Sequence, residues 1–298
     1  MRNRTDYEVE RVSDGYFFPE GIRWHRERVW FGDVRGAAVW VLDPAVRGAR
    51  PRRIAMAEGA CPAGLGWLPD GRLLVADMPT RRVLRVEQDG TIATHATLSP
   101  SCRGFANDAI HLSDGTFVVG DMGIKSFGAL GSDRFPGRLL VVSPDGKVAE
   151  VIDDLDTPNG IAVPPDESCL ILAETLRSRL TVFPLAGSTL GEPRTFAVLG
   201  DPKDPRSPRP DGICLDSAGA VWVANLYGRE VIRVADGGEI LERIPTPDVR
   251  PTSCVLGGPG RQDLFITAVE APNQEEVMKA PTGIVMRVTV DVPGAGRP

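Results

Sequence analysis

Four oxygen-bearing side chains hold the same position in short segments that recur along the chain. They are Glu20 in FPEGIRW, Asn107 in FANDAIH, Asn159 in TPNGIAV and Asp211 in RPDGICL. Two further segments, CPAGLGW and RPTSCVL, have Ala63 and Thr252 there. Carboxylate and amide oxygens are the ligands that hard divalent cations take in proteins. A single Asn-Gly or Asp-Gly is ordinary turn chemistry, so a metal site requires that the four residues converge.

These segments open six copies of a longer repeat, in which a turn, a short apolar strand, a second turn and two more strands follow one another. The copies begin at Pro19, Pro62, Phe105, Pro158, Pro210 and Pro251. A spacing of about 40–50 residues is typical of propeller blades built from four short strands. We therefore predict an all-β fold, a six-bladed β-propeller that forms a single domain over residues 1–298. The N-terminal DYEVERVSDG is predicted to be the outer strand that closes the last blade.

In a propeller, the first strand of each blade lines the central channel, and the residue just before it lies at the channel mouth. Glu20, Asn107, Asn159 and Asp211 are then expected to meet on one axis. Two carboxylates that lie close together repel each other unless a proton or a cation neutralises one of them. We predict that these four residues bind one divalent metal ion, with Asn107 either ligating it directly or holding a water or substrate oxygen. Asp108 points the other way along an extended chain and is expected to support the site.

The same segments resemble the regucalcin/gluconolactonase family, which is also similar to diisopropylfluorophosphatase. The family motifs EG, ND, PNG and PDG are matched in order at Glu20, Asn107, Asn159 and Asp211, and the C-terminal motif is matched by PTSCVLGGPGRQDLFITAV. The resemblance implies one divalent metal, most often calcium, with zinc, manganese or magnesium serving some members. It implies hydrolysis of a small lactone or a related ester, with the metal polarising the carbonyl. It also gives Asp211 the role of general base or nucleophile.

One departure from the family pattern concerns the substrate. Sugar-lactone members carry an Arg two residues before the Asn of the ND motif, whereas this chain has Phe105 there. A phenyl ring offers an apolar face instead of hydrogen bonds, so we expect a lactone or ester less polar than a sugar lactone. Further substrate contacts are predicted at Phe18, which precedes Glu20, and in the long loop 120–138. The loop residues are Asp121, Met122 and Phe127.

Composition and charge exclude several other classes. The net charge is −6 and no dense basic run is present, so nucleic acid is not an expected partner. No stretch approaches the ~20 apolar residues of a membrane span, and the N-terminus has no apolar core of a secretory signal. The five cysteines are widely spaced without a C-x-x-C, as expected of free thiols in a reducing cytoplasm. A small molecule is therefore the expected partner.

Other functions on the same scaffold remain open at this point. A phosphotriesterase, a dehydratase or a synthase is possible on the same fold, because a fold does not fix the chemistry. A non-catalytic propeller that binds calcium is another alternative. The three histidines, His25, His95 and His111, are not paired at metal-ligand spacing, and no G-x-S-x-G elbow is present. The four converging oxygen side chains favour a metal-dependent hydrolase over an interaction module.

Overall fold

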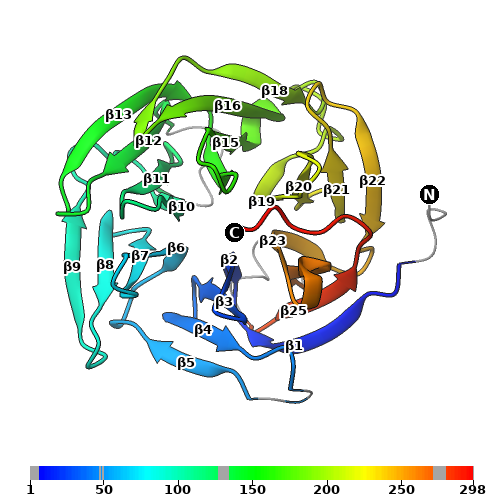
Figure 1. Ribbon diagram of the computed structural model, residues 1–298, viewed down its shortest axis with the longest axis horizontal. Coiled ribbons are helices and arrows are strands. Elements are labelled where there is room, and N and C mark those ends of the chain that lie inside the picture. Colours follow the sequence, from blue (N-terminus) through cyan, green and yellow to red (C-terminus); the bar gives the residue numbers. More distant parts are fainter. Residues whose placement is uncertain (1–6, 47, 49, 127–133, 271–279, 298) are drawn as a thin grey trace.

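The computed structural model describes residues 7–46, 48, 50–126, 134–270 and 280–297. Its strands form six antiparallel sheets that are arranged in a ring around one central axis (Figure 1). This arrangement confirms the predicted six-bladed β-propeller. Within the described residues, no helix has the length and the apolar character needed to cross a lipid bilayer.

The blades follow one another in chain order. Blade 1 contains β2 (Pro19–His25), β3 (Arg28–Asp33), β4 (Ala38–Leu42) and β5 (Arg52–Ala55). Blade 2 contains β6 (Pro62–Trp67), β7 (Leu73–Asp77), β8 (Arg82–Val86) and β9 (Ile92–Thr97). Blade 3 contains β10 (Ala106–His111), β11 (Phe117–Asp121), β12 (Gly137–Val142) and β13 (Val148–Leu155).

The second half of the ring has the same plan, with two short 3₁₀ helices added. Blade 4 contains β14 (Pro158–Ala162), β15 (Cys169–Glu174), the 3₁₀ helix η1 (Thr175–Arg177), β16 (Arg179–Ala186), β17 (Thr189–Leu190) and β18 (Arg194–Val198). Blade 5 contains β19 (Pro210–Leu215), β20 (Val221–Asn225), β21 (Glu230–Val234) and β22 (Ile240–Pro245). Blade 6 contains β23 (Arg250–Gly257), the 3₁₀ helix η2 (Pro259–Arg261), β24 (Asp263–Val269), β25 (Gly283–Thr289) and β1 (Glu10–Tyr16).

The N-terminal strand closes the ring as predicted. β1 pairs antiparallel with β25, in a register that runs from Glu10 opposite Arg287 to Tyr16 opposite Gly283. The last blade is thus built from both ends of the described chain (Figure 1). Pairing the N-terminal strand in this way leaves no gap between the first and last blades.

Burial falls from the inside of each blade to the outside. The inner strands β6, β14 and β19 are buried along their whole length, whereas most residues of the outer strands β1 and β5 are exposed or half-buried. Strands that are covered on both faces read as continuous apolar runs. This is why the inner strands stand out in the sequence.

The hydrophobic core is divided among the gaps between neighbouring blades. Six clusters of buried side chains each join two adjacent sheets, and the first and last blades share one of them. In that shared cluster, the rings of Trp24 and Phe265 stack nearly parallel with their centroids 5.7 Å apart. Packing between blades therefore fixes where each inner strand lies around the axis.

Glycine directly after the repeated position held by Glu20, Ala63, Asn159 and Asp211 allows the inner strands to come close. A Cβ atom on Gly160 would lie 2.5 Å from the backbone oxygen of Asp211, and one on Gly64 would lie 2.2 Å from the backbone nitrogen of Ala109. Real Cβ atoms do not approach backbone atoms this closely. The Gly of TPNG therefore serves close strand packing between blades.

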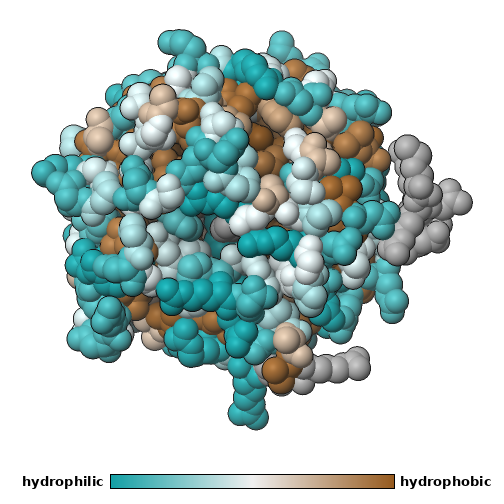
Figure 2. All heavy atoms as spheres, in the orientation of Figure 1, coloured by the Kyte–Doolittle hydropathy of each residue, from teal (hydrophilic) through white to brown (hydrophobic). Residues whose placement is uncertain are grey.

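The C-terminal segment crosses the channel at the C-terminal ends of the inner strands. Gly294 bridges to Asp216, and the backbone N–H of Ala295 donates to the carbonyl oxygen of Leu215 at the end of β19. Arg297 then pairs with Glu167. In Figure 1 this segment reaches the centre of the ring, and the face of the molecule on this side is largely hydrophilic (Figure 2). The tail thus covers one end of the channel.

Candidate functional site

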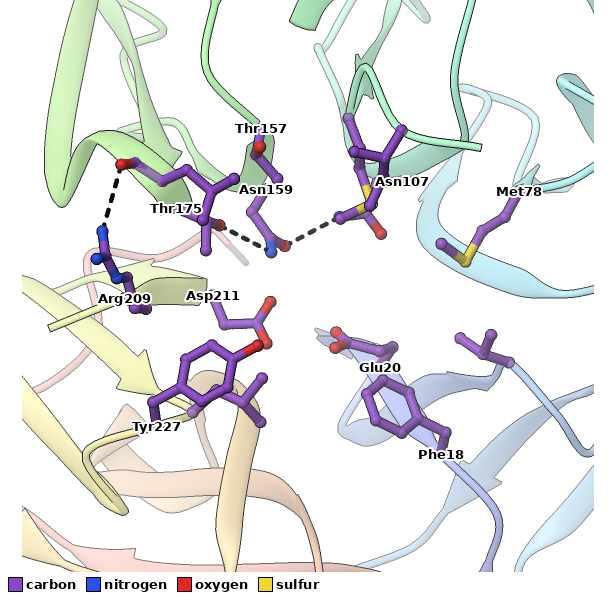
Figure 3. Close-up of a pocket in the computed structure, with 15 residues that line it drawn as sticks. Phe18, Glu20, Met78, Asn107, Thr157, Asn159, Thr175, Arg209, Asp211 and Tyr227 are labelled. Carbon is purple, nitrogen blue, oxygen red and sulfur yellow. Dashed lines mark hydrogen bonds between the residues drawn. The ribbon is translucent and has the colours of Figure 1, made fainter. Parts of the chain in front are cut away.

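The other end of the channel brings together the four side chains predicted as metal ligands, here called the quartet: Glu20, Asn107, Asn159 and Asp211. Each is the second residue of its inner strand, in β2, β10, β14 and β19 respectively, rather than the residue before the strand as the sequence suggested. All four line a cavity of about 80 Å³ and point towards a common space (Figure 3). All four are buried, with relative exposures of 5–9%.

A backbone irregularity positions each member of the quartet. In all six inner strands, the pairing with the second strand shifts register at this point, for example between Pro158 and Ile161 and between Pro210 and Ile213. A bulge of this kind bends the strand and changes the direction of a side chain. Because of these six bulges, the second residue of each inner strand does not follow the regular alternation of side chains between the two faces of the sheet.

Hydrogen bonds tie the amide members of the quartet to neighbouring blades. The Asn107 Nδ2 group donates to Asn159 Oδ1 over 3.1 Å, and Asn159 Nδ2 donates to Thr175 Oγ1 over 3.2 Å. The Thr175 hydroxyl in turn donates to the carbonyl oxygen of Pro210 over 2.7 Å. This chain of contacts, drawn in part in Figure 3, joins blades 3, 4 and 5 beside Asp211.

The two carboxyl groups of the quartet resist ionisation. Burial raises the pKa of Asp211 to about 8, and the charge of Asp108 adds to the rise, while a hydrogen bond from Asn159 opposes it. Burial, followed by the charges of Asp211 and Asp108, raises the pKa of Glu20 well above its usual range. Two carboxylates in one buried space therefore repel each other and lack solvation.

The quartet fits a divalent cation. None of the ion pairs among the described residues involves Glu20 or Asp211, and the charge of Arg23, which is paired with Asp108, offsets only a small part of the rise in the pKa of Glu20. The donor set consists of oxygen atoms from two carboxylates and two amides, which suits a hard ion. Among the described residues, no three His, Cys, Asp or Glu side chains form a group that could hold a metal. The quartet contributes only two such side chains, because its other two members are amides.

Asp108, which the sequence places in a supporting role, is paired within the channel. Its Oδ1 atom lies 2.6 Å from Nη2 of Arg23, and both side chains are almost fully buried. Its Oδ2 atom accepts the backbone N–H of Ile161 in the next blade over 3.2 Å. Arg23 also donates to the carbonyl oxygen of Ala109. Asp108 is therefore neutralised and held in place next to the quartet.

A second repeated feature, which sequence reasoning missed, shapes the cavity. Five of the second strands end in an acidic or amide residue, namely Asp33, Asp77, Asp121, Glu174 and Asn225. Each accepts backbone N–H groups from the segment that leads into the inner strand of its own blade. Asp121, for example, accepts from Arg103 over 2.6 Å and from Gly104 over 2.9 Å. These residues hold the entry to each inner strand.

The residue after each of these strand ends lines the cavity. The five are Val34, Met78, Met122, Thr175 and Leu226. The signal was available in the sequence, because the strand ends FGDV, VADM, VGDM, LAET and VANL recur at the same place in successive copies. Aligning the copies on this position, as well as on the quartet, would have found this part of the cavity.

The predicted substrate contacts have different outcomes. Phe18 and Met122 line the cavity. Asp121 does not line it, because its carboxylate faces the backbone N–H groups that it holds. Phe105 does not line it either, since its backbone pairs with that of Met122 and Ile124, and these two side chains occupy that part of the wall. Phe127 lies outside the described residues.

The histidines and cysteines take no part in the cavity. His25 stacks on Trp67 with centroids 3.9 Å apart, at the end of the channel opposite the quartet. All five cysteines are free thiols. Burial raises the pKa values of Cys61 and Cys102, so neither is favoured as a thiolate.

The chain matches the model of the SMP-30/Gluconolactonase/LRE-like region over residues 18–270. It is 30% identical to the pentonolactonase XacC of Haloferax volcanii over 292 residues, which cover 94% of this chain and 92% of that protein. It is 33% identical to a 6-deoxy-6-sulfogluconolactonase of Pseudomonas putida over 168 residues, which span only 57% of that relative.

Solved structures agree on the fold. A calcium-binding protein, regucalcin, from Agrobacterium tumefaciens superimposes with a TM-score of 0.80 at 21% identity, covering 98% of this chain and 97% of that one. A luciferin-regenerating enzyme superimposes with the same TM-score at 20% identity, covering 97% of each chain. At this level of sequence identity, the structural similarity shows the propeller fold alone.

Proposed function

Since the chain belongs to the SMP-30/gluconolactonase/LRE-like family, we propose that it is a lactonase, a hydrolase that opens the ring ester of a small lactone. Two relatives are named for lactone hydrolysis, and one of them is matched over nearly its full length. The observation that carries the proposal is the convergence of Glu20, Asn107, Asn159 and Asp211 at the base of a cavity. These are the positions to which the family resemblance gives the reactive centre.

We propose that the quartet holds one divalent metal ion, with calcium as the first candidate and zinc, manganese or magnesium as alternatives. The support is the pair of buried carboxylates, which have no ion-pair partner among the described residues, together with the two amides beside them. A solved structure of the same fold is described as a calcium-binding protein. When bound, the ion supplies Lewis-acid chemistry, by which a carbonyl is polarised or the pKa of a water is lowered.

The side chains of this protein have separate roles in the proposed reaction. Glu20 and Asp211 supply negative charge at the base of the cavity, and the hydrogen bond from Asn107 to Asn159 fixes the orientation of both amides. In its ionised form, which a bound cation would favour over the neutral acid that burial favours, Asp211 accepts a proton from the attacking water. The water oxygen then bonds to the carbonyl carbon and the ring C–O bond breaks. The departing alkoxide takes the proton, so that one lactone and one water give one hydroxy acid.

The test is a comparison of lactones with the metal controlled. The protein is stripped with chelator, and acid release from aliphatic, aromatic and sugar lactones is followed while calcium, magnesium, manganese or zinc is added back. Metal-dependent turnover is expected for at least one lactone, and Asp211→Ala is expected to lose it. Asp236→Ala, which removes an exposed carboxylate paired with Arg194, is the matched control and keeps activity.

Metal binding without turnover of any lactone contradicts the proposal. Aryl esters and phosphotriesters are then measured in the same assay. Turnover of phosphotriesters alone points to phosphotriesterase chemistry at the same centre, whereas turnover of neither supports a non-hydrolytic role.

A further inference from the structure

One side of the cavity is an apolar wall formed by blades 1 to 3. The wall consists of Phe18, Val34, Met78, Met122 and Ile124. Val34, Met78 and Ile124 are at most 2% exposed, and together with Phe18 and Met122 they belong to one hydrophobic cluster, which Phe105 and Cys61 back from outside the cavity. The wall is therefore continuous and supported from behind.

The other side of the cavity, from blades 4 and 5, has two leucines, Leu176 and Leu226, and polar side chains most of whose hydrogen bonds are already in use. Thr175 donates to the carbonyl oxygen of Pro210 and accepts from Asn159. Thr157 donates to Asp156. Each hydroxyl has one hydrogen to donate, so neither threonine has a donor left for a ligand.

Arg209 is committed in the same way. Its guanidinium donates to Ser178 Oγ over 2.9 Å and to the carbonyl oxygen of Pro202 over 2.6 Å, so it holds the surrounding segments together. Among the described lining residues outside the quartet, the Tyr227 hydroxyl is the polar side-chain group without a hydrogen bond inside the protein.

The cavity is therefore poorly equipped for a polyhydroxylated ligand. A hydroxyl that leaves water for a site without a partner costs about 1–3 kcal/mol. A hydrocarbon group placed against the apolar wall gains about 0.8 kcal/mol for each methylene that it buries. The two effects act in the same direction, towards a substrate with few hydroxyls.

From this division of the cavity we propose that the substrate is a lactone bearing an apolar hydrocarbon substituent, which lies against the wall of blades 1 to 3 while the ring ester faces the quartet. This inference rests on the proposed lactonase function and specifies its substrate class. The wall residues Met78 and Met122 determine the specificity. Each directly follows the second strand of its blade, the two blades are neighbours, and both side chains lie in the wall of the cavity. Their flexible thioether side chains adapt to substituents of different shape.

The experiment compares lactones that differ in one feature at a time. γ-Butyrolactone, γ-hexalactone and γ-octalactone share a ring and differ in alkyl length, while δ-hexalactone and gluconolactone share a ring size and differ in hydroxylation. The metal-loaded protein is expected to show kcat/KM at least about tenfold higher for γ-octalactone than for γ-butyrolactone. It is also expected to prefer δ-hexalactone to gluconolactone.

Variants locate the substituent in the cavity. Met78→Gln and Met122→Gln keep the side-chain volume while making the wall polar, and each is expected to reduce the preference for γ-octalactone about tenfold. Leu226→Gln makes the same kind of change on the opposite side and is the matched control, with the preference retained. Calcium affinity and the melting temperature verify that each variant is folded. If Met78→Gln does not fold, Phe18→Ser repeats the test at a half-buried position.

Each outcome decides a separate point. Turnover of gluconolactone that equals or exceeds that of δ-hexalactone overturns the inference and leaves the lactonase proposal standing. An equal loss of preference in Leu226→Gln and in the methionine variants overturns the placement on blades 1 to 3. Turnover of no lactone at all contradicts the proposed function, and the substrate class is then rejected with it. A second readout is calorimetric binding of γ-lactams of increasing alkyl length, which is expected to tighten in the wild type and not in Met78→Gln.

Discussion

The two ends of the central channel are built from the same six inner strands but differ in whether their buried charged groups have ion-pair partners. At the quartet end, Glu20 and Asp211 are buried carboxyl groups without an ion-pair partner among the described residues. At the tail end, Arg297 pairs with Glu167 and donates to the carbonyl oxygen of His111. The buried carboxyl groups thus have no ion pair at the quartet end, whereas the charged groups at the tail end are paired.

The comparison separates carboxylates that support the fold from those suited to chemistry. Asp108, Asp121 and Glu174 are as deeply buried as the quartet, yet Asp108 and Glu174 are paired with arginines and Asp121 accepts three backbone N–H groups. A buried charge without a partner is costly, so proteins keep it where a ligand or a reaction uses it. Burial alone therefore does not identify a site. Glu20 and Asp211 differ from the other buried carboxylates because each has a single hydrogen bond and no ion pair among the described residues.

The largest expected effect comes from removing charge at the quartet. Glu20→Gln keeps the shape of the side chain and is expected to lower kcat/KM on the best lactone roughly a thousandfold, or about 4 kcal/mol, through lost metal binding. Because the pKa of Glu20 is raised by burial and by Asp211, the neutral amide relieves repulsion. The metal-free variant is therefore expected to melt no lower than the wild type. Steady-state kinetics measure the activity and melting curves measure the stability. A variant that stays active but melts at a lower temperature would show that Glu20 supports the fold rather than the reaction.

Glu174→Gln is the matched change at a partnered carboxylate. The Glu174 side chain accepts hydrogen bonds from the backbone of Asp156, from Thr181 and from Arg179. Weakening this buried set is expected to cost about 2 kcal/mol of unfolding free energy, a value reduced from that of a fully buried pair because the arginine is partly exposed. Urea unfolding measures the loss. If Glu174→Gln kept its stability and lost calcium binding, Glu174 would behave as Glu20 does, and the distinction between carboxylates that support the fold and those that bind the metal would be wrong.

The sequence predicted the quartet end better than it predicted the cavity above it. The inner strands begin within one residue of the predicted copy starts, because a buried strand that begins with Pro and has a close-packed Gly as its third residue recurs in four of the six copies. The bulge at each quartet position could not be read from periodicity, since a register shift breaks the alternation on which such reading depends.

The walls were only partly predictable. Phe18 was found from its place before Glu20, but Met78 was missed because the residues after the second strand were not compared between copies. Phe105 was placed in the cavity by its offset from Asn107, and the structure puts Met122 and Ile124 there instead. Pairing between a loop and the start of an inner strand is tertiary information that a single sequence does not contain.

The smallest expected effect concerns pH at the tail end. Burial, followed by the charges of Arg297, Arg23 and His25, lowers the pKa of His111 to about 3. The folded protein therefore holds the neutral imidazole, and stability is fully present above the unfolded pKa of about 6.5 and falls as pH decreases below it. His111→Gln is expected to remove about 1 kcal/mol of the loss between pH 7 and pH 5, after allowance for partial exposure. Urea unfolding at the two pH values gives the difference, and an identical pH dependence in both proteins would contradict the stated cause.

The central claim, that the quartet is a metal-dependent lactonase centre, is tested most directly by titrating the stripped protein with calcium while acid release and thermal unfolding are recorded on the same sample. The account predicts that activity saturates at one calcium per chain. It also predicts stabilisation that reaches about 2.7 kcal/mol when free calcium is a hundred times the dissociation constant. Glu20→Gln is expected to show neither response. Full lactone turnover by protein that retains far less than one metal per chain, unaffected by added calcium, magnesium, manganese or zinc, would contradict the claim.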